Sequence, residues 1–422
     1  MTKIIPPQNW MQDPACIAVM QALTSGGSTA RFVGGCVRDA LLGRPINDVD
    51  IATDSLPEDV IGLLEDAKIR SIPTGLKHGT VTAVIDHKTF EITTLRHDIE
   101  TFGRHANVAF SASWQEDAAR RDFTMNAISL DLDGTLHDYF NGYEDAKAGI
   151  VRFVGTPTKR LKEDYLRLLR YFRFHAYYGK GTPDHASLEA CINLAGNMKS
   201  LSGERIQQET LRLFKAPNPI STFEIMVEGN IYHHLFTDPA IDLNKDDIDS
   251  FKRYLKLEKK HNLKVDSLCR MAVLFKRHLA PKQAKDIANR LVLSNRDADN
   301  WQNYITVSLE AKSPMDTIDN YQLIDRFGGE TVKNILAITA AVTGVGITPD
   351  WWTFINEKSN IPFPIQGRDA LNFGIPHGPT VGEYLKATRL WWLEAGFVAD
   401  KEQCLGYLKT LIDKNIQKFD ER

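Results

Sequence analysis

The spacing of the apolar residues changes near residue 155, and this change limits the possible fold more than any other feature. Before it, stretches that alternate apolar and polar residues predict strands, and residues 78–86 and 88–96 form such a pair around a turn near His87. After it, apolar residues recur at helical spacing, which predicts a helix over residues 155–174. Strand signals become rare from there on. We therefore predict an α+β protein, with a small mixed α/β part followed by a long helical part.

The first 150 residues contain further signals of strands and helices. We expect a strand, a turn and a helix over 30–43, a strand over 48–53, a helix over 55–67 and a hairpin over 128–140. Ser55 is predicted to cap the second of these helices, with Pro57 in its first turn. Asp133 and Gly134 are predicted to form the turn of the hairpin.

The composition excludes several classes of protein. The 422 residues are 43% hydrophobic, which is typical of a globular chain of two to four domains. The five cysteines form no C-x-x-C pair, which argues against a zinc site or a disulfide scaffold and for a reducing compartment. There is no signal-peptide core and no apolar run of ~18 residues, so we expect a cytoplasmic protein without a membrane span. With a net charge of −3, a polyanion would have to be held by local basic patches.

Two carboxylates lie on one face of the predicted strand over 48–53. Asp48 and Asp50 alternate with Val49 and Ile51, which places them roughly 6–7 Å apart along the backbone. Such a pair suits Mg²⁺, a hard ion that takes one or two carboxylates together with substrate phosphates. Asp-x-Asp also occurs at solvated strand edges and in metal-dependent glycosyltransferases. Glu91 is the candidate for a third, catalytic carboxylate, because it lies in an apolar strand where a charge is costly.

Glycines and a cation precede this pair. Gly34 and Gly35 occupy a strand-to-helix turn, where backbone N–H groups can approach a phosphate. Arg38 follows in the first helical turn, where an acidic residue would be expected unless the site binds an anion. The structural alternative is that the glycines form only a tight turn.

A second polar cluster lies at residues 120–130. Arg120 and Arg121 can neutralise a triphosphate through forked hydrogen bonds. Asp122 or Asn126 can bind a ribose hydroxyl. The same residues would also suit the start of a helix, with Asp122 as its cap.

Charged residues recur every three positions in the predicted helix over 155–174: Asp164, Arg167, Arg170 and Arg173. Asp164 beside Arg167 offers an acceptor for an exocyclic amine and donors for ring nitrogen or oxygen atoms. Cytosine and adenine match this pattern, whereas guanine and uracil present the wrong edges. The alternative is a salt-bridged basic helix surface.

Taken together, these motifs resemble those of the class II CCA-adding enzymes, the tRNA nucleotidyltransferases of the poly(A) polymerase family. The matching stretches are GGCVRDALLGRPINDVD, RRDFTMNA, DYFNGYEDAKAGIVRFVG, EDYLRLLRYFRF and LSGERIQQE, with a weaker match in GRDALNFGIPHGPTVGEYL. The resemblance implies four domains: a nucleotidyltransferase head over 1–150, a nucleotide-selecting neck over 151–215, a helical body over 216–310 and a helical, tRNA-binding tail over 311–422.

The resemblance also assigns roles to residues. Asp48 and Asp50 hold Mg²⁺, Asp164 and Arg167 select the base, and Arg170 and Arg173 support them. Gly35, Arg38 and one of Arg120 and Arg121 contact phosphate, and Asp122 contacts ribose. The expected reaction is attack of the tRNA 3′-hydroxyl on the α-phosphate of CTP, twice, and then of ATP, with release of pyrophosphate.

The expected partners are the tRNA acceptor arm, CTP and ATP, with a chain that is a monomer or a weak dimer. The main alternative is a poly(A) polymerase of the same family, which adds AMP to RNA. The loop over 97–111, with Arg104 and His105, favours full CCA addition. The complete acidic set disfavours a non-catalytic RNA-binding protein, and the Asp-x-x-Arg pattern disfavours a glycosyltransferase.

Overall fold

The computed structural model describes residues 3–6, 8–102, 105–236, 241–309 and 317–420, with the backbone alone for 98–102, 105–108 and 415–420. The chain forms two compact units. Unit 1 comprises residues 1–242 with 290–292, and unit 2 comprises residues 243–289 with 293–422. The division into head, neck, body and tail remains a prediction.

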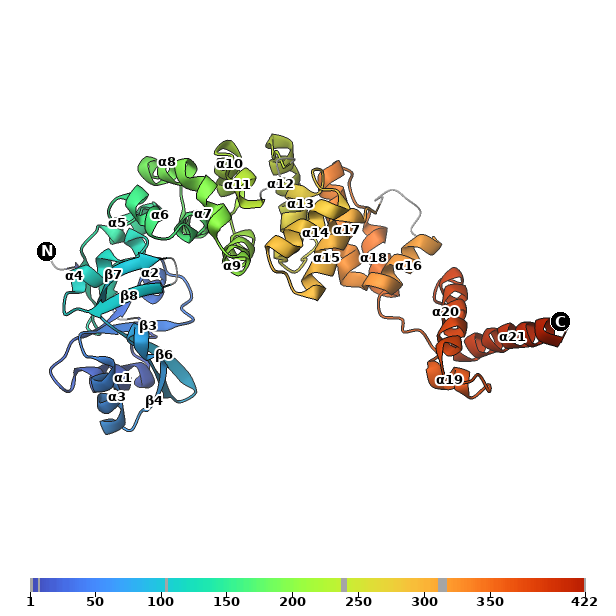
Figure 1. Cartoon of the computed structure of the whole chain (residues 1–422), viewed down its shortest axis with the longest axis horizontal. Helices are drawn as coiled ribbons and strands as arrows, with labels where there is room; N and C mark the ends of the chain where they lie inside the picture. The colour runs from blue at the N-terminus through green and yellow to red at the C-terminus, as the bar shows by residue number, and fades with distance from the viewer. Residues whose placement is uncertain (1–2, 7, 103–104, 237–240, 310–316, 421–422) are drawn as a thin grey trace. The chain divides into compact units, whose positions relative to one another are not determined.

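Unit 1 contains every strand of the described chain, and these strands form two sheets (Figure 1). The larger sheet has eight strands in the order β1-β10-β9-β2-β3-β6-β5-β4. The smaller sheet pairs β7 with β8. The strands are β1 (Lys3–Ile4), β2 (Ala30–Val33), β3 (Val49–Thr53), β4 (Arg70–Gly75), β5 (Thr80–Ile85), β6 (Lys88–Thr94), β7 (Arg96–Phe102), β8 (His105–Phe110), β9 (Ile128–Leu130) and β10 (Thr135–Asp138).

Helices make up the rest of unit 1 and all of the regular structure in unit 2. Those of unit 1 are α1 (Pro14–Thr24), α2 (Gly35–Leu41), α3 (Pro57–Asp66), α4 (Trp114–Ala119), α5 (Gly142–Ala148), α6 (Pro157–Glu163), α7 (Leu166–Tyr178), α8 (His185–Leu194), α9 (Gly203–Phe214), α10 (Ile220–Glu228) and α11 (Ile231–Phe236), with 3₁₀ turns η1 (Leu76–His78), η2 (Thr124–Asn126) and η3 (Ala195–Ser200). Those that follow are α12 (Lys245–Lys260), α13 (Ser267–Phe275), α14 (Pro281–Arg290), α15 (Asn295–Thr306), α16 (Ile318–Phe327), α17 (Gly329–Thr343), α18 (Pro349–Lys358), α19 (Gly367–Leu371), α20 (Pro379–Glu394) and α21 (Lys401–Asp420).

The expected α+β class is confirmed. After β10, the described chain contains no further strand, only one isolated bridge between Phe123 and Phe153. Both predicted hairpins form, β5 with β6 and β9 with β10. The first turns through Asp86 and His87, whose φ angles of 49° and 62° are those of a tight primed hairpin turn. No helix within the described ranges is long and apolar enough to cross a membrane.

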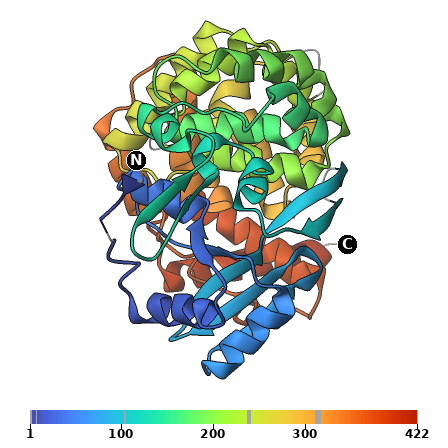
Figure 2. The same cartoon turned by 90° about the vertical axis from the view of Figure 1, so that its left-hand side faces the viewer.

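The core of unit 1 lies between the larger sheet and the helices that pack on it. Helices α1 and α3 contact each other and the strands beside them (Figures 1 and 2). Alternation along β3 sends Ile51 into this core and leaves Asp50 on the other face. The predicted cap of α3 is wrong, because Leu56 occupies the N-cap and no side chain bonds there. Pro57, the first residue of α3, lacks an N–H group and begins the helix without needing that cap.

The predicted helix over 155–174 is also wrong in one respect, because it is two helices. Asp164, between α6 and α7, has an extended backbone with φ −157° and ψ 107°. Its side chain accepts a hydrogen bond from the backbone N–H of Leu166, which competes with helix formation. In a continuous helix, the carbonyl of Arg160 would accept from the Asp164 N–H. Here it accepts instead from the Arg167 guanidinium, at 2.9 Å.

Unit 2 is built around large aromatic side chains. Trp301, Trp351 and Trp392 are fully buried in it. The Lys276 ammonium group donates to three carbonyl oxygens at the end of α15, at 2.7–2.9 Å. These bonds satisfy backbone groups that the helix itself leaves without partners.

Two glycines provide a test of the packing in unit 1. A Cβ at Gly142 would lie 2.0 Å from the Thr124 carbonyl oxygen, whereas a Cβ at Gly62, inside α3, would meet no atom within 4 Å. Gly142→Ala should therefore lower the free energy of unfolding by about 2 kcal/mol or more. Gly62→Ala should raise it by about 0.5–1 kcal/mol, since alanine favours helix. Thermal and urea unfolding measure both, and a neutral Gly142→Ala would contradict this packing.

Candidate active site

A cavity of about 470 Å³ in unit 1 collects most of the residues that the sequence singled out. Its walls come from the β2–α2 turn, β3, the segment before β9, the α6–α7 break, α7 and α9. The lining residues are Gly34, Gly35, Arg38, Asp50, Arg120, Arg121, Asp122, Asn126, Asp164, Leu166, Arg167, Arg170, Phe174 and Arg205. Of the predicted residues, Asp48, Glu91 and Arg173 do not line it. Leu166, Phe174 and Arg205 were not predicted.

Of the three predicted metal-site carboxylates, Asp50 lines this cavity, and the other two lie close to it in the chain or in the sheet. Asp50 on β3 is paired in parallel register with Glu91 on the neighbouring β6, and Asp48 immediately precedes β3. Burial raises the pKa of Asp50, and the nearby charges of Glu91 and Asp48 raise it further, while Arg121 opposes them. Glu91 is exposed, so the expectation that its charge is costly in an apolar strand is wrong. Its strand has one solvated face, and Glu91 lies on it.

The Gly-Gly turn brings the backbone close to charged groups. Gly34 has φ 72°, which favours glycine. A Cβ on Gly34 would lie 3.1 Å from Nη1 of Arg121 and 3.9 Å from Oδ2 of Asp50. A side chain at this position would therefore crowd both groups. Glycine leaves the space between the turn, the arginine and the carboxylate open to a ligand.

Arg38 is held in place by neighbours on two sides. Its Nη1 donates to Oδ1 of Asn126 at 2.6 Å, and its Nη2 pairs with Asp39 at 2.8 Å. The guanidinium also lies over the ring of Tyr178, 4.2 Å from the centroid. These contacts fix the direction of a buried cation on the cavity wall.

Arg120 and Arg121 share one carboxylate that the sequence analysis did not select. Asp117 in α4 accepts from Nη2 of Arg120 at 2.6 Å and from Nη2 of Arg121 at 3.0 Å. Burial alone would raise the pKa of Asp117, but the two guanidinium groups outweigh it and lower that pKa. The spacing of three and four residues is that of a helix face, and this signal could have identified Asp117.

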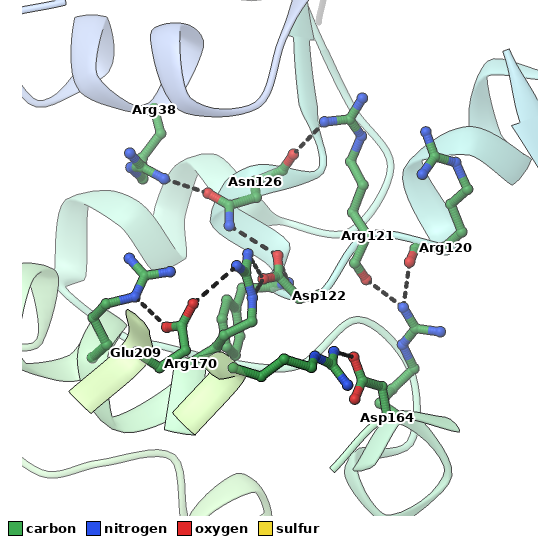
Figure 3. A network of polar contacts seen from close by, with 12 residues as sticks. Arg38, Arg120, Arg121, Asp122, Asn126, Asp164, Arg170 and Glu209 are labelled. Atoms are coloured by element: carbon green, nitrogen blue, oxygen red, sulfur yellow. Dashed lines mark hydrogen bonds and ion pairs between the residues drawn. The ribbon is translucent and has the colours of Figure 1, made fainter. Parts of the chain in front are cut away.

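Asp122 is the centre of a hydrogen-bond network (Figure 3). Its Oδ1 accepts from the Phe123 N–H and from Nδ2 of Asn126, both at 2.9 Å. Its Oδ2 accepts from Nε and Nη2 of Arg170, at 2.8 and 2.5 Å. A carboxylate has about four such acceptor positions. All of them are used here, so a ribose hydroxyl would have to replace one of these bonds, and the predicted ribose contact remains a prediction.

Glu209 on α9 extends the network to the supporting arginines. Its carboxylate accepts from Nε of Arg173 at 2.5 Å and lies 3.7 Å from Nη1 of Arg170. The Glu209 side chain is only 5% exposed, so both cations compensate a buried charge. Arg170 and Arg173 therefore share a carboxylate partner, which lies 36 residues after Arg173, and their supporting role in base selection remains a prediction.

Asp164 and Arg167 each have partners other than one another. Oδ2 of Asp164 accepts from Nη2 of Arg205 at 2.6 Å, and Oδ1 accepts from the Leu166 N–H at 3.1 Å. Nη1 of Arg167 donates to Glu163 and to the Arg160 carbonyl. Both side chains nevertheless line the same cavity. The two groups expected to select a base therefore face one space, and each is braced separately.

Comparison with known proteins identifies the family. Residues 30–152 match the family model of the poly A polymerase head domain, and residues 182–243 match the probable RNA and SrmB-binding site of polymerase A. The mitochondrial CCA tRNA nucleotidyltransferase 1 of Mus musculus is 33% identical over 90% of this chain and 86% of its own length. The chain belongs to the CCA-adding enzyme family.

Further members of the CCA-adding enzyme family agree with this placement. The CCA-adding enzyme of Geobacillus stearothermophilus is 32% identical over 88% of the chain and 90% of its own length. The crystal structure of the Bacillus stearothermophilus CCA-adding enzyme in complex with CTP aligns with 98% of this chain, at a TM-score of 0.70 and 26% identity. The fold and the nucleotidyltransferase activity expected from the sequence are thereby confirmed.

The Asp122–Arg170 pair should make stability depend on pH. Burial alone would raise the pKa of Asp122. The charge of Arg170 and the hydrogen bonds outweigh this effect and hold that pKa at about 2, below its ordinary 3.8. A lowered carboxyl pKa stabilises the fold above pH 4, by about 2 kcal/mol here, and this contribution is lost as pH falls from 4 towards 2. Asp122→Asn should therefore be less stable than wild type at pH 7, and the difference should shrink below pH 4 in urea unfolding.

The exposed Asp86→Asn is a matched control for this measurement. It removes one carboxylate from a hairpin turn in which asparagine also adopts a positive φ. Its stability should follow that of wild type at every pH. An Asp122→Asn protein whose deficit is the same at pH 7 and pH 3 would contradict the charge-based account.

Proposed function

We propose that this protein adds CCA to the 3′ end of tRNA, using CTP and ATP as substrates. Membership of the CCA-adding enzyme family supports this proposal. The observation that carries it is the composition of the cavity, which is lined by the carboxylate of Asp50, by several arginines, and by the acceptor–donor pair Asp164 and Arg167. These are the groups needed for a metal-bound triphosphate and for a base with an exocyclic amine.

The acidic edge of the cavity fits a divalent metal, which enzymes of this family generally use. Burial, and after it the like charges of Glu91 and Asp48, raises the pKa of Asp50, and a bound cation would favour its charged form. Among the described residues, no three His, Cys, Asp or Glu converge on one metal position. This fits Mg²⁺, which takes one or two carboxylates and completes its shell with phosphate and water. Asp48 and Asp50 would hold it, and when bound it would supply activation of the tRNA 3′-hydroxyl and charge neutralisation at the triphosphate.

The residues of the chain bind and orient the two substrates. Arg120 and Arg121 hold the triphosphate, and the Gly34 turn leaves room for it beside Arg38 and Asp50. The tRNA 3′-oxygen then forms its bond to the α-phosphorus in line with the departing pyrophosphate. Glu91 remains a candidate for a third catalytic carboxylate, next to Asp50 in the sheet.

The braced pair retains the capacity to bind a base. Asp164 uses one acceptor position on each oxygen for its internal partners, which leaves one on each for an exocyclic amine. Within the described part of the chain, the hydrogen bonds of Arg167 are made through Nη1, so Nε and Nη2 can donate to a ring nitrogen or carbonyl. The pair therefore selects cytosine and adenine without losing its supports.

The remaining parts of the proposal concern partners and organisation. The head over 1–150 and neck over 151–215 would hold the nucleotide, and the body over 216–310 and tail over 311–422 would bind the tRNA acceptor arm. We propose a cytoplasmic enzyme that is a monomer or a weak dimer. The segment over 97–111, expected to be a loop, is largely the β7–β8 pair. It would support full CCA addition, and Arg104 and His105 lie outside the described side chains.

Offering each labelled NTP to tRNA that ends at the discriminator base tests the function directly. Wild type should add two C residues and then one A, as read by sequencing the product ends. Asp50→Asn should lower incorporation of both nucleotides by about 100-fold or more, because it removes a charge that stabilises the transition state. Its binding of tRNA should be largely retained, and the exposed Asp66→Asn in α3 serves as the control.

A poly(A) polymerase is the second candidate, because the matched head-domain model carries that name. It predicts long runs of A from ATP alone and no use of CTP. If the same experiment gave that result, the proposed function would be poly(A) synthesis and not CCA addition. Near-normal activity of Asp50→Asn would exclude this residue from the metal site.

Altering the selecting pair should change nucleotide choice as well as rate. Asp164→Ala removes the acceptor for the amine that CTP and ATP share, and it also removes the repulsion of the carbonyl in UTP and GTP. The ratio of kcat/KM for CTP over UTP should fall by about tenfold or more. A folded Asp164→Ala enzyme with unchanged ratios for the four NTPs would show that this residue only braces the α6–α7 junction.

A further inference from the structure

The ring of Tyr178, the last residue of α7, lies against two guanidinium groups. The guanidinium carbon of Arg38 is 4.2 Å from the ring centroid, and that of Arg44 is 4.3 Å from it. A cation over the face of an aromatic ring is attracted by the negative potential of that face. Arg38 lines the cavity, whereas Tyr178 is not among the lining residues. Any effect of Tyr178 on a ligand in the cavity must therefore pass through Arg38.

Arg38 has N–H groups left for a phosphate. Its Nε and Nη2 donate to the Asp39 carboxylate, at 3.1 and 2.8 Å. Its Nη1 donates to Oδ1 of Asn126 at 2.6 Å (Figure 3). Within the described part of the chain, these bonds leave one N–H of Nη1 and one of Nη2 for a ligand. The direction in which these two groups point depends on how the whole guanidinium is oriented.

Asp39 alone does not fix this orientation. It follows Arg38 in the same helix, and its side chain is 20% exposed, so the two residues can move together. The polar and cation–π contacts from outside α2 come from Asn126 and Tyr178, with the ring of Phe174 further away at 5.3 Å. Without Tyr178, a single hydrogen bond and this longer contact would remain.

Arg44 holds the ring beside Arg38. Its Nη2 donates to the Tyr177 carbonyl oxygen at 2.6 Å, in the last turn of α7, where helix carbonyls lack partners within the helix. Its backbone N–H donates to the Asp39 carbonyl at 2.8 Å. The turn after α2 is thereby attached to the end of α7. Burial raises the pKa of Tyr178, so the phenol stays neutral at neutral pH and its ring face is what the cations meet.

We propose that Tyr178 is a positioning residue for triphosphate binding, which acts by orienting the Arg38 guanidinium towards the phosphates. This inference rests on the proposed CCA addition and on the phosphate contact of Arg38 in it. The triphosphate is common to all four NTPs, so the proposal predicts a change in affinity without a change in base choice. The competing explanation is that Tyr178 contributes only to the packing of α7.

Removing the ring should weaken triphosphate binding. Tyr178→Leu should raise KM for both CTP and ATP by about fivefold and change kcat by less than about twofold. The CTP/UTP ratio of kcat/KM should stay within about twofold of wild type, unlike that of Asp164→Ala. Inorganic tripolyphosphate has neither base nor ribose, and it should inhibit Tyr178→Leu about fivefold less strongly, with free Mg²⁺ held constant. Unchanged inhibition of a folded Tyr178→Leu enzyme would overturn the proposal.

Variants that keep the shape of the ring separate its electrostatic role from packing. Tyr178→Phe keeps the ring face and should be inhibited by tripolyphosphate within about twofold of wild type. A fluorinated phenylalanine at position 178 keeps nearly the same shape but withdraws the negative potential from the face, so inhibition should weaken towards that of Tyr178→Leu. Equal inhibition of the two enzymes would show that shape alone matters and would overturn the proposal.

Tyr143→Leu is the matched control. Lys3 and Lys147 lie over the Tyr143 ring, at 3.2 and 4.5 Å from its centroid, and none of these three residues lines the cavity. Its inhibition by tripolyphosphate should equal that of wild type. A loss as large as that of Tyr178→Leu would mean that removing any such ring has this effect, and it would overturn the proposal.

The double variant Arg38→Met/Tyr178→Leu tests whether Tyr178 acts through Arg38. Adding Tyr178→Leu to Arg38→Met should change the inhibition by less than about twofold. A further loss equal to that in the wild-type background would overturn the proposal. Circular dichroism and thermal unfolding establish that each variant is folded.

The outcomes also separate this inference from the function on which it rests. Wild type that fails to add CTP and ATP to tRNA would overturn the proposed function itself. Wild type that adds CCA normally, together with a Tyr178→Leu enzyme of unchanged KM and unchanged inhibition by tripolyphosphate, would overturn only the role of Tyr178.

Discussion

The ion pair between Asp122 and Arg170 is the contact on which the geometry of the cavity depends. It joins the segment after α4, which carries Arg120 and Arg121, to α7, which carries Arg167. From Asp122 the hydrogen bonds continue through Asn126 to Arg38, and from Arg170 the charges continue to Glu209. Removing Arg170 would leave the Asp122 carboxylate, only 10% exposed, without its cation, and such a loss typically costs about 3–5 kcal/mol. The phosphate-binding and base-selecting walls are therefore joined by this ion pair, and the Arg160 guanidinium of α6, which donates to the carbonyl oxygens of Arg120 and Arg121, joins them a second time.

Short-range patterns in the sequence predicted many of the elements of unit 1 and most of the cavity residues, but they missed α1 and β4 and treated the β7–β8 pair as a loop. Alternation identified β3 and both hairpins, and the Gly34–Gly35 turn and the two arginines at 120 and 121 were recognisable because each motif lies within a few residues. The helical periodicity over 155–174 was correct for the apolar face but did not reveal the break. The periodicity of apolar residues indicates which residues are buried. Asp164 ends one helix before the next begins, but it leaves the apolar spacing unchanged, so the break is not visible in the sequence.

The partners of the cavity residues were harder to predict, for a physical reason. Arg205 contacts Asp164 at the α6–α7 break, and Glu209 contacts Arg173 of α7. Both lie on a helix 36–41 residues further along the chain than their partners, so no local spacing relates them. We expected the charge of Glu91 to be costly in an apolar strand. This expectation was wrong, because alternation in β6 gives that strand one solvated face, on which Glu91 lies. The domain boundaries and the individual catalytic roles remain predictions, since a fold does not by itself assign chemistry to a side chain.

The position of Arg170 has a consequence for the modularity of the chain. Asp122 lies in the head expected over 1–150, but its cation lies 48 residues further on, in the expected neck. A fragment that ended at residue 150 would retain the complete sheet yet would leave the Asp122 carboxylate with no guanidinium beside it. The head and neck therefore cannot be exchanged between proteins as independent building blocks unless this acid and base are transferred together. Recombination within such a family would be constrained by one charge pair more than by the boundary of the sheet.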